Sequence, residues 1–389
     1  MDHKLSPELE ELRRTVEEFA HDVVAPKIGD LYERHEFPYE IVREMGRMGL
    51  FGLPFPEEYG GMGGDYLALG IALEELARVD SSVAITLEAG VSLGAMPIHL
   101  FGTEEQKRQW LPRLCSGEIL GAFGLTEPDG GSDAGATRTT AQLDPETDEW
   151  VINGTKCFIT NSGTDITGLV TVTAVTDRGP EDGAPLISSI IVPSGTPGFT
   201  VAPPYSKVGW NASDTRELSF VDVRVPRANL LGTLGRGYAQ FLRILDEGRI
   251  AIAALATGLA QGCVDESVRY AKERHAFGRP IGANQAIQFK LADMEMRAHT
   301  ARVTWRDAAS RLVAGEPFKR EAAMAKLYSS TIAVDNARDA TQIHGGYGFM
   351  NEFPVARMWR DSKILEIGEG TSEVQRMLIA RELGLPQRS

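Results

Sequence analysis

The chain has 389 residues, and 40 Lys and Arg against 54 Asp and Glu give it a formal net charge of −14. This length suggests two or three domains, and 42% hydrophobic with 24% charged residues is typical of a globular protein that buries its cores. The negative charge argues against nucleic-acid or anionic-membrane partners, because both are bound by clustered Lys and Arg.

Cysteine and histidine patterns exclude further classes of protein. Cys115, Cys157 and Cys263 are far apart and form no C-x-x-C pair, which disfavours a disulfide framework and suits a reducing cytoplasm. The seven histidines show no H-E-x-x-H spacing, so no metal site is predicted. The uncharged runs 250–264 and 183–206 are short or broken by prolines, so no membrane span is predicted and a cytoplasmic location is expected.

The first third of the chain has helical patterns. Ser6-Pro7 is a helix start signal, and apolar residues follow it at helical spacing from Leu9 to Val23. A loop rich in glycine and proline covers 54–64, and Tyr66 to Val79 is again helical. Thr103 to Leu114 is predicted as one more helix, because Thr103 and Gln106 have the spacing of a capping box.

Near Gly121 the pattern changes to strands. Short apolar runs alternate with turn signals up to about Val225, as expected of a small antiparallel sandwich or barrel. The turn signals are Asn153-Gly154, Asp182-Gly183 and Pro197-Gly198, and the runs are 150–152, 157–160, 169–175, 186–192, 199–201 and 218–225.

From about Gly237 the chain is helical once more. Apolar residues from Ile287 to Leu312 are three and four apart, which predicts a long amphipathic helix suited to a bundle. Ala322 to Ile343 is predicted as another helix, and Ser372 with Gln375 suggests a capping box at the last one. The order is not βαβ, so we expect an α+β multidomain fold with domains 1–120, 121–228 and 229–389.

The common nucleotide and hydrolase motifs are absent. The glycines near 61–64 and 346–348 fail G-x-G-x-x-G, and neither G-x-x-x-x-G-K-[ST] nor G-x-S-x-G occurs. Four other segments are polar and glycine-rich for their surroundings. They are 124–133, 156–161, the pair 274–278 with 342–348, and 366–375.

Each of these segments has a structural and a functional interpretation. The first three can be an irregular loop, a half-buried strand and two helix ends, or they can contact a flat ring and a phosphate. Glu369 stands between two glycines just before a predicted helix. It can be an exposed loop acid, or, if desolvated, a general base with a raised pKa.

Taken in order, the motifs resemble those of the FAD-dependent acyl-CoA dehydrogenase family. The family implies an N-terminal helical domain, a central antiparallel β-domain, a C-terminal four-helix bundle and a homotetramer acting in fatty acid β-oxidation. The motifs are Pro56-Glu57-Glu58-Tyr59-Gly60-Gly61, Leu125-Thr126-Glu127-Pro128, Phe158-Ile159-Thr160-Asn161, Arg274-x-x-Phe277-Gly278, Asn284-Gln285, Gln342-Ile343-His344-Gly345-Gly346-x-Gly348 and Glu369-Gly370-Thr371-Ser372-Glu373.

The resemblance implies a set of site residues. Phe158 would pack on the flavin, where many relatives have Trp, and Thr160 would bond near N5. The other implied FAD residues are Leu125, Thr126, Ser132, Arg274, Phe277, Gln285, Gln342, Gly345, Gly346, Thr371 and Glu373, those from 274 to 346 reaching the FAD of a neighbouring subunit. The implied substrate contacts are Ser132, Asp246, Arg249, Gly370 and Arg381.

The resemblance also implies the reaction. Glu369 would take the α-proton of an acyl-CoA thioester as the β-hydride moves to flavin N5, giving the trans-2-enoyl-CoA. An electron-transfer flavoprotein would then accept the electrons. Some relatives carry the base in the segment matching 246–249, and the position that would hold it is Gly248 here, beside Glu247.

Two departures and three alternatives complete these expectations. Gly248 and Gly368 lack side chains near the base, which predicts a roomy pocket, with Leu87, Ala89 and Leu93 along its acyl part. The alternatives are a flavoprotein oxidase or monooxygenase on the same fold, and a non-catalytic acyl-CoA-binding protein. A thioester on a carrier protein is a third, as the substrate.

Overall fold

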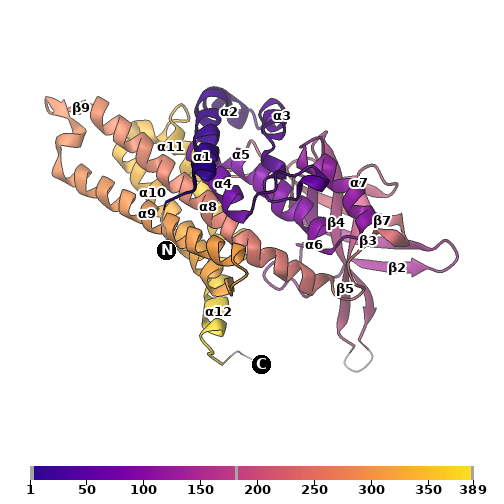
Figure 1. The fold of residues 1–389 in the computed structure, drawn as a ribbon. Helices are drawn as coiled ribbons and strands as arrows, with labels where there is room; N and C mark the ends of the chain where they lie inside the picture. The colour runs from indigo at the N-terminus through magenta and orange to yellow at the C-terminus, as the bar shows by residue number, and fades with distance from the viewer. Residues whose placement is uncertain (1–3, 180–182, 387–389) are drawn as a thin grey trace.

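The computed structural model describes residues 4–179 and 183–386, and it runs from helices through strands to helices (Figure 1). The first part is entirely helical. Its elements are α1 (Pro7–Phe19), η1 (Ala20–Val24), α2 (Ala25–Glu33), α3 (Tyr39–Arg47), η2 (Leu50–Gly52), η3 (Glu57–Tyr59), α4 (Tyr66–Val79), α5 (Ser81–Glu88), η4 (Ala89–Ala95), α6 (Met96–Phe101) and α7 (Glu104–Cys115).

The predicted helix starts are confirmed in this part. The Ser6 hydroxyl accepts a hydrogen bond from the Leu9 amide at 3.3 Å, so α1 begins where the Ser-Pro signal placed it. Thr103 and Gln106 form the expected capping box at α7. Helix α4 has the predicted bounds, and the Asp65 carboxylate caps it.

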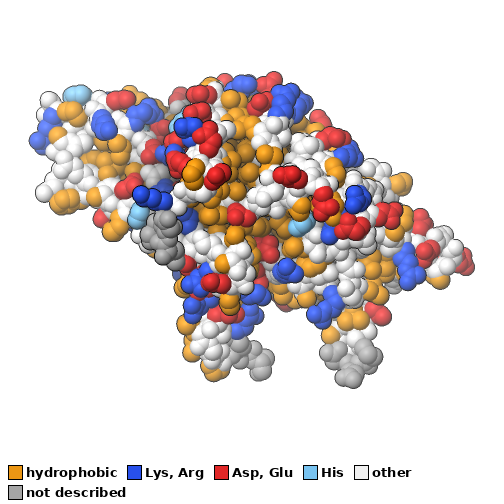
Figure 2. Space-filling view, viewed as in Figure 1, with side chains coloured by type: hydrophobic (Ala, Val, Ile, Leu, Met, Phe, Trp, Pro, Cys, Tyr) orange, Lys and Arg blue, Asp and Glu red, His pale blue; other side chains and the backbone are white. Residues whose placement is uncertain are grey.

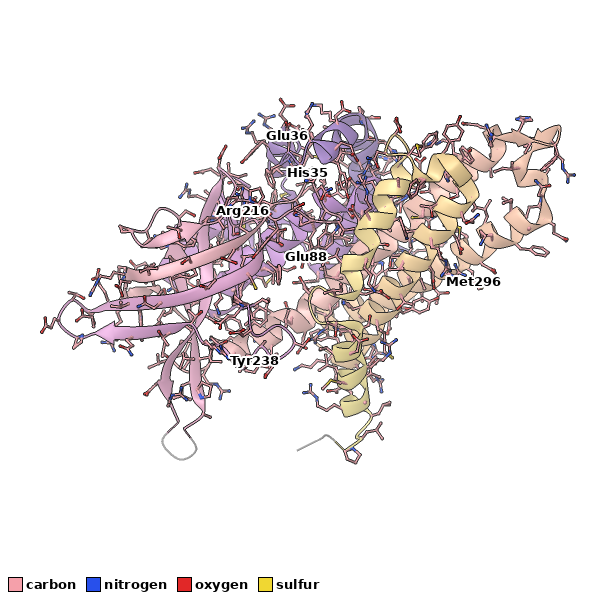
Figure 3. All side chains as sticks on the ribbon, turned by 180° about the vertical axis from the view of Figure 1, so that it is seen from behind. His35, Glu36, Glu88, Arg216, Tyr238 and Met296 are labelled. Carbon is pink, nitrogen blue, oxygen red and sulfur yellow. The ribbon has the colours of Figure 1, made fainter. Side chains whose placement is uncertain are left out.

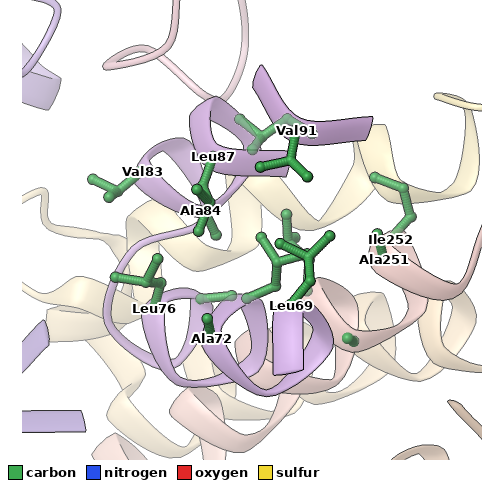
Figure 4. Packing of buried hydrophobic residues seen from close by; sticks show 14 of the residues in the cluster. Leu69, Ala72, Leu76, Val83, Ala84, Leu87, Val91, Ala251 and Ile252 are labelled. Carbon is green, nitrogen blue, oxygen red and sulfur yellow. The ribbon is translucent and has the colours of Figure 1, made fainter. Parts of the chain in front are cut away.

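The run from Ser81 to Phe101 is long and apolar enough to cross a membrane, but 83% of its most apolar window is buried inside the protein. It contains α5, the π-helical segment η4 and α6. Leu87 and Val91 from this run pack with Leu69 of α4 and with Ile252 in the main core (Figure 4). The run is therefore a core element here, and it is where the N-terminal helices meet the C-terminal ones.

The central β-domain is confirmed, and its sheet is mixed rather than purely antiparallel. The strand order is β6-β7-β3-β2-β4-β5-β8, and β1 pairs with β4 in parallel. The other pairs are antiparallel except for one parallel β2–β4 contact. The strands are β1 (Leu120–Gly124), β2 (Thr140–Asp144), β3 (Glu149–Thr160), β4 (Thr167–Arg178), β5 (Pro185–Pro193), β6 (Phe199–Val201), β7 (Thr215–Pro226) and β8 (Leu230–Leu231).

The prediction of a turn at Asn153-Gly154 is wrong. These residues lie inside β3, at a register shift against β7, so β3 joins the two apolar runs 150–152 and 157–160 into one strand. Gly154 has φ 153°, and a Cβ there would stand 2.4 Å from the Thr139 hydroxyl oxygen. The glycine serves a close approach within the sheet and makes no reversal. Of the other two signals, Gly198 has the left-handed φ of 83° between β5 and β6, and Asp182 is outside the described residues.

The C-terminal part packs long helices side by side. Small residues on the 37-residue helix α8 permit close approach, since a Cβ at Gly258 would stand 2.1 Å from the Glu74 carbonyl oxygen of α4. The elements are α8 (Gly237–Glu273), β9 (His275–Ala276), β10 (Arg279–Pro280), η6 (Ile281–Ala283), α9 (Gln285–Val313), α10 (Lys319–His344), η7 (Gly345–Phe349), α11 (Pro354–Ser362), η8 (Lys363–Glu366) and α12 (Ser372–Glu382).

Buried polar contacts fix the three parts relative to one another. The Asp361 carboxylate accepts hydrogen bonds from the Tyr32 hydroxyl at 2.5 Å, the Ser81 hydroxyl at 2.8 Å and the Trp210 amide at 2.7 Å. These donors come from the N-terminal helices and from the segment before β7. Because a buried carboxylate needs such partners, the contacts define the positions of the segments that surround the site.

The outer surface agrees with the composition. On the face shown in Figure 2, Lys and Arg side chains alternate with Asp and Glu side chains and form no extended basic area. On the same face, α12 and the β4–β5 hairpin project from one side of the molecule with an open gap between them (Figures 1 and 2).

Candidate active site

Glu369 lies in the short loop between η8 and α12. Its backbone has φ 52°, a left-handed conformation that costs a residue other than glycine on the order of 1 kcal/mol. Both carboxyl oxygens are buried and have no hydrogen-bond partner among the described residues. Burial raises the pKa of this carboxyl, whereas its interaction with Glu88 and the charges of Lys326 and Arg249 lower that pKa.

Gly248 of α8 leaves the space that the Glu369 carboxyl occupies. A Cβ at residue 248 would stand 2.5 Å from Glu369 Oε2. The prediction that Gly248 widens the pocket is therefore wrong, because the base itself fills that volume. At Gly368 a Cβ would meet only the Ile364 carbonyl oxygen, at 3.5 Å, so this glycine does leave open space.

A second buried acid, Glu88, faces Glu369 from the end of α5. It is completely buried, neither of its oxygens has a hydrogen-bond partner among the described residues, and it lies near the middle of the molecule (Figure 3). Burial raises the pKa of Glu88 well above its ordinary value, and repulsion by Glu369 adds to the shift. Sequence inspection missed it, although it is the only acid between residues 81 and 101.

The peptide of the Glu369 loop is held by two buried side chains. The Gly370 carbonyl accepts hydrogen bonds from Lys326 Nζ at 2.7 Å and from Gln375 Nε2 at 2.9 Å. The predicted capping box of Ser372 and Gln375 is wrong by one residue, because Thr371 caps α12 through the Val374 amide at 3.3 Å. Gln375 turns back to Gly370 instead, which leaves the left-handed turn at Glu369 and Gly370 firmly held.

Helix α8 brings three charged residues beside the base. Asp246 and Arg249 are buried and form an ion pair, and Lys319 Nζ lies 2.8 Å from the other Asp246 oxygen. Arg249 Nε has no partner among the described residues, so a donor remains for an added acceptor. Burial raises the pKa of Glu247 to about 7, and its one ion-pair partner in the described part of the chain is Arg243, at 4.0 Å.

The β-domain presents an exposed aromatic ring beside the predicted flavin loop. Phe158 is 66% exposed, has φ 61° and lies 5.3 Å from the ring of Tyr205. The Thr126 carbonyl accepts from the Cys157 amide at 2.9 Å, which holds the loop after β1 against β3. Thr160 ends β3 next to this ring.

The same loop is anchored by the buried ion pair of Lys156 and Glu127. Lys156 Nζ lies 2.7 Å from the Glu127 carboxylate and donates to the Leu125 carbonyl at 3.0 Å. Further along the loop, Ser132 is exposed. Leu125 and Thr126 thus share one edge with Phe158 and Thr160, and an exposed apolar ring beside a hydroxyl suits a flat heteroaromatic group.

The remaining predicted cofactor residues lie at the other end of the molecule. Arg274, Gly345 and Gly346 line a cavity of about 430 Å³, where the Arg274 guanidinium stands 5.6 Å from the Tyr347 ring centre. Phe277 is fully exposed with φ 51°. Gln285 and Gln342 are exposed nearby. Figures 1 and 3 place the β9–β10 end of the bundle far from the sheet, so one chain does not bring the two groups together.

Helix α12 carries the last predicted residues. Thr371 is its cap, and the side chains of Glu373 and Arg381 are exposed on it, with Arg381 3.9 Å from Glu382. In the segment that runs from α5 into η4, Leu87 and Ala89 are buried and Leu93 is half-buried. No cluster of three or more potential metal-ligating side chains occurs in the described ranges.

Three family models match consecutive parts of the chain, the N-terminal, middle and C-terminal domains of acyl-CoA dehydrogenase, over residues 6–118, 122–223 and 235–384. A Bacillus subtilis protein, probable acyl-CoA dehydrogenase YngJ, is 51% identical over 383 residues, which cover 98% of this chain and 100% of that protein.

Solved structures share the whole fold. Butyryl-CoA dehydrogenase from Megasphaera elsdenii matches with a TM-score of 0.94 at 41% identity, over 98% of this chain and 100% of that chain. A chain from a study of the electron transferring flavoprotein of Acidaminococcus fermentans matches with a TM-score of 0.94 at 42% identity, over 98% and 99%. Acyl-CoA dehydrogenase complexed with FAD from Bacillus anthracis matches at 0.91 and 35%, over 99% and 69%.

Proposed function

The chain belongs to the acyl-CoA dehydrogenase family, and we propose that it oxidises short acyl-CoA thioesters with Glu369 as the base. The protein is an FAD-dependent acyl-CoA dehydrogenase, an oxidoreductase that converts the thioester to the trans-2-enoyl-CoA. The observation that carries the assignment of the base is the buried, unpartnered carboxyl of Glu369, which Gly248 accommodates.

The position of Glu369 supports proton abstraction. A carboxylate in a desolvated site has a raised pKa, which brings its basicity closer to that needed for a weakly acidic α-proton. Glu369 and Gly370 both have positive φ, and a backbone amide of this turn would stabilise negative charge on the thioester oxygen. Asp246, Arg249 and Arg381 are the proposed substrate contacts, with Ser132 and Gly370.

The residues present fit the FAD that the family uses. Phe158 offers an uncovered ring, and Leu125, Thr126, Ser132 and Thr160 lie along the same edge of the β-domain. When bound, FAD accepts the hydride from the substrate β-carbon. Arg274 and the glycines 345 and 346, with Phe277, Gln285, Gln342, Thr371 and Glu373, are the proposed contacts to its phosphates and adenosine.

The substrate class is proposed from two observations. Butyryl-CoA dehydrogenase shares the whole fold, and the Glu369 carboxyl fills the volume at Gly248, so of the two glycines Gly368 alone leaves added room. We therefore expect straight acyl-CoA thioesters with acyl chains of about four to six carbons to bleach the flavin of the purified protein most completely in a titration with chains of increasing length. Equal bleaching by long or strongly branched chains would contradict this preference.

The proposed electron acceptor is an electron-transfer flavoprotein in the cytoplasm. The match to a chain studied with such a flavoprotein supports the acceptor, and three free buried cysteines suit the reducing compartment. Rapid oxygen consumption by the reduced enzyme would instead favour the oxidase alternative on the same fold.

The enzyme is proposed to be an oligomer, as a tetramer or at least a dimer. The two groups of FAD residues lie at opposite ends of one chain, so a neighbouring copy is needed to complete the site. Helix α9 also exposes Phe289, Met296 and Val303 seven residues apart, an apolar stripe that a second copy would cover. Sedimentation of the holoprotein is expected to give two or four copies, and a monomer that keeps FAD would contradict the proposal.

A further inference from the structure

The Glu369 loop is surrounded by more buried acid than buried base. Glu88 of α5 and Glu247 of α8 are both buried, and burial raises the pKa of each. Burial raises the pKa of the Tyr66 hydroxyl of α4, and the charges of Glu247, Glu88 and Glu369 add to this shift. This hydroxyl therefore stays neutral and contributes no positive charge near the loop. Burial also raises the pKa of Glu369, and a base with a raised pKa favours its protonated form, in which it cannot accept the α-proton.

The cations near the loop differ in how they are paired. Arg249 is paired with Asp246, which also binds Lys319, so its charge is largely compensated. Lys363 is paired with Glu366 at 2.6 Å. The acid Glu373 is exposed on α12. Lys326 of α10 differs from these paired cations, because it is completely buried and forms no ion pair with any described carboxylate.

Among the residues that the structure describes, the one hydrogen bond of the Lys326 side chain goes to the loop that carries the base. Its Nζ donates to the Gly370 carbonyl at 2.7 Å, one residue after Glu369. Burying an ammonium group without a carboxylate partner costs desolvation free energy. This cost argues against a role for Lys326 as a structural anchor alone. An uncharged donor, Gln375, already binds the same carbonyl at 2.9 Å.

We propose that Lys326 is a positioning residue for the base, one that holds the Glu369-Gly370 peptide and keeps the Glu369 carboxylate ionised by its charge. The proposal rests on the proposed role of Glu369. Burial lowers the pKa of Lys326 to about 8, and the negative charge of Glu369 opposes this shift most strongly. Lys326 in turn lowers the pKa of Glu369, so each charge stabilises the other.

The test compares two variants that each remove one donor to the Gly370 carbonyl. Lys326→Met removes a donor and a charge, and Gln375→Leu removes a donor only. The measurement is kcat/KM of the holoenzyme against pH with butyryl-CoA and an artificial electron acceptor. Because Glu369 must be ionised to act, activity falls as the pH falls through its pKa, and loss of a nearby cation raises that pKa.

Lys326→Met is expected to move the acid limb of the profile upward by about one pH unit, and to lower kcat/KM about tenfold at pH 6. Gln375→Leu is expected to lower kcat with the limb in place. If Lys326→Met does not fold, Lys326→Gln keeps a donor without the charge and should show the same shift.

An acid limb that moves no further in the two Lys326 variants than in Gln375→Leu would overturn the proposal and leave Lys326 as an anchor. Activity in Glu369→Gln would instead refute the role of Glu369 itself. The two failures are therefore distinguishable.

Discussion

Replacement of Glu369 by glutamine is expected to leave FAD bound and to abolish bleaching of the flavin by acyl-CoA. The amide is nearly the same size as the carboxyl, so it fits the space above Gly248, but it cannot accept the α-proton. Loss of a positioned general base costs on the order of 10²–10⁴ in rate. Stopped-flow absorbance of the purified variant with butyryl-CoA would measure the loss.

Two variants control for this result. Glu366→Gln removes an acid three residues away that pairs with Lys363 and lies outside the buried pocket, so its effect should be small. Glu247→Gln tests the other buried acid near the segment where some relatives carry the base. If the Glu247→Gln variant were inactive and the Glu369→Gln variant active, the base would be Glu247.

Substitution of Gly248 by alanine is expected to lower activity while it stabilises the fold. A Cβ there would stand 2.5 Å from Glu369 Oε2, so the end of a flexible side chain must shift, and a shift of about 1 Å can cost about 10²-fold in rate. Alanine is favoured over glycine inside a helix by about 1 kcal/mol, and residue 248 lies within α8. Steady-state kinetics and thermal unfolding of the same sample would measure both effects.

Gly368→Ala is the matched control, because it adds the same methyl group next to the base without contact. The nearest atom to a Cβ there is the Ile364 carbonyl oxygen at 3.5 Å, an ordinary van der Waals distance. We expect near-normal turnover of butyryl-CoA. If both alanine variants lost activity equally, the steric explanation at Gly248 would be wrong.

Much of the fold is predictable from local pattern. Helices such as α4, α7 and α9 were predicted within a residue or two, because caps and apolar spacing are local properties. The strand pairing of the sheet is harder to predict from sequence, since the parallel pairing of β1 with β4 joins residues far apart in the chain. The domain boundaries at 120 and 228 stay predictions.

Part of the candidate site can also be predicted from sequence, and part of it cannot. Motif order identified the family, and the structure places Leu125 and Thr126 beside Phe158 and Thr160 as one edge. Positive φ at Phe158, Phe277 and Glu369 marks three of the predicted site residues as strained, which no motif shows. The roles of the individual site residues stay proposals.

By itself, the sequence determined the family, the order of helical and strand domains, the cofactor and the reaction, because ordered motifs and local periodicity carry that information. Only the tertiary structure revealed Glu88 and Lys326, and showed that Gly248 makes room for the base and not for substrate. The physical reason is that desolvation and charge interaction depend on distances between α5, α8, α10 and the Glu369 loop. Those distances exist only after residues nearly 300 positions apart have packed together.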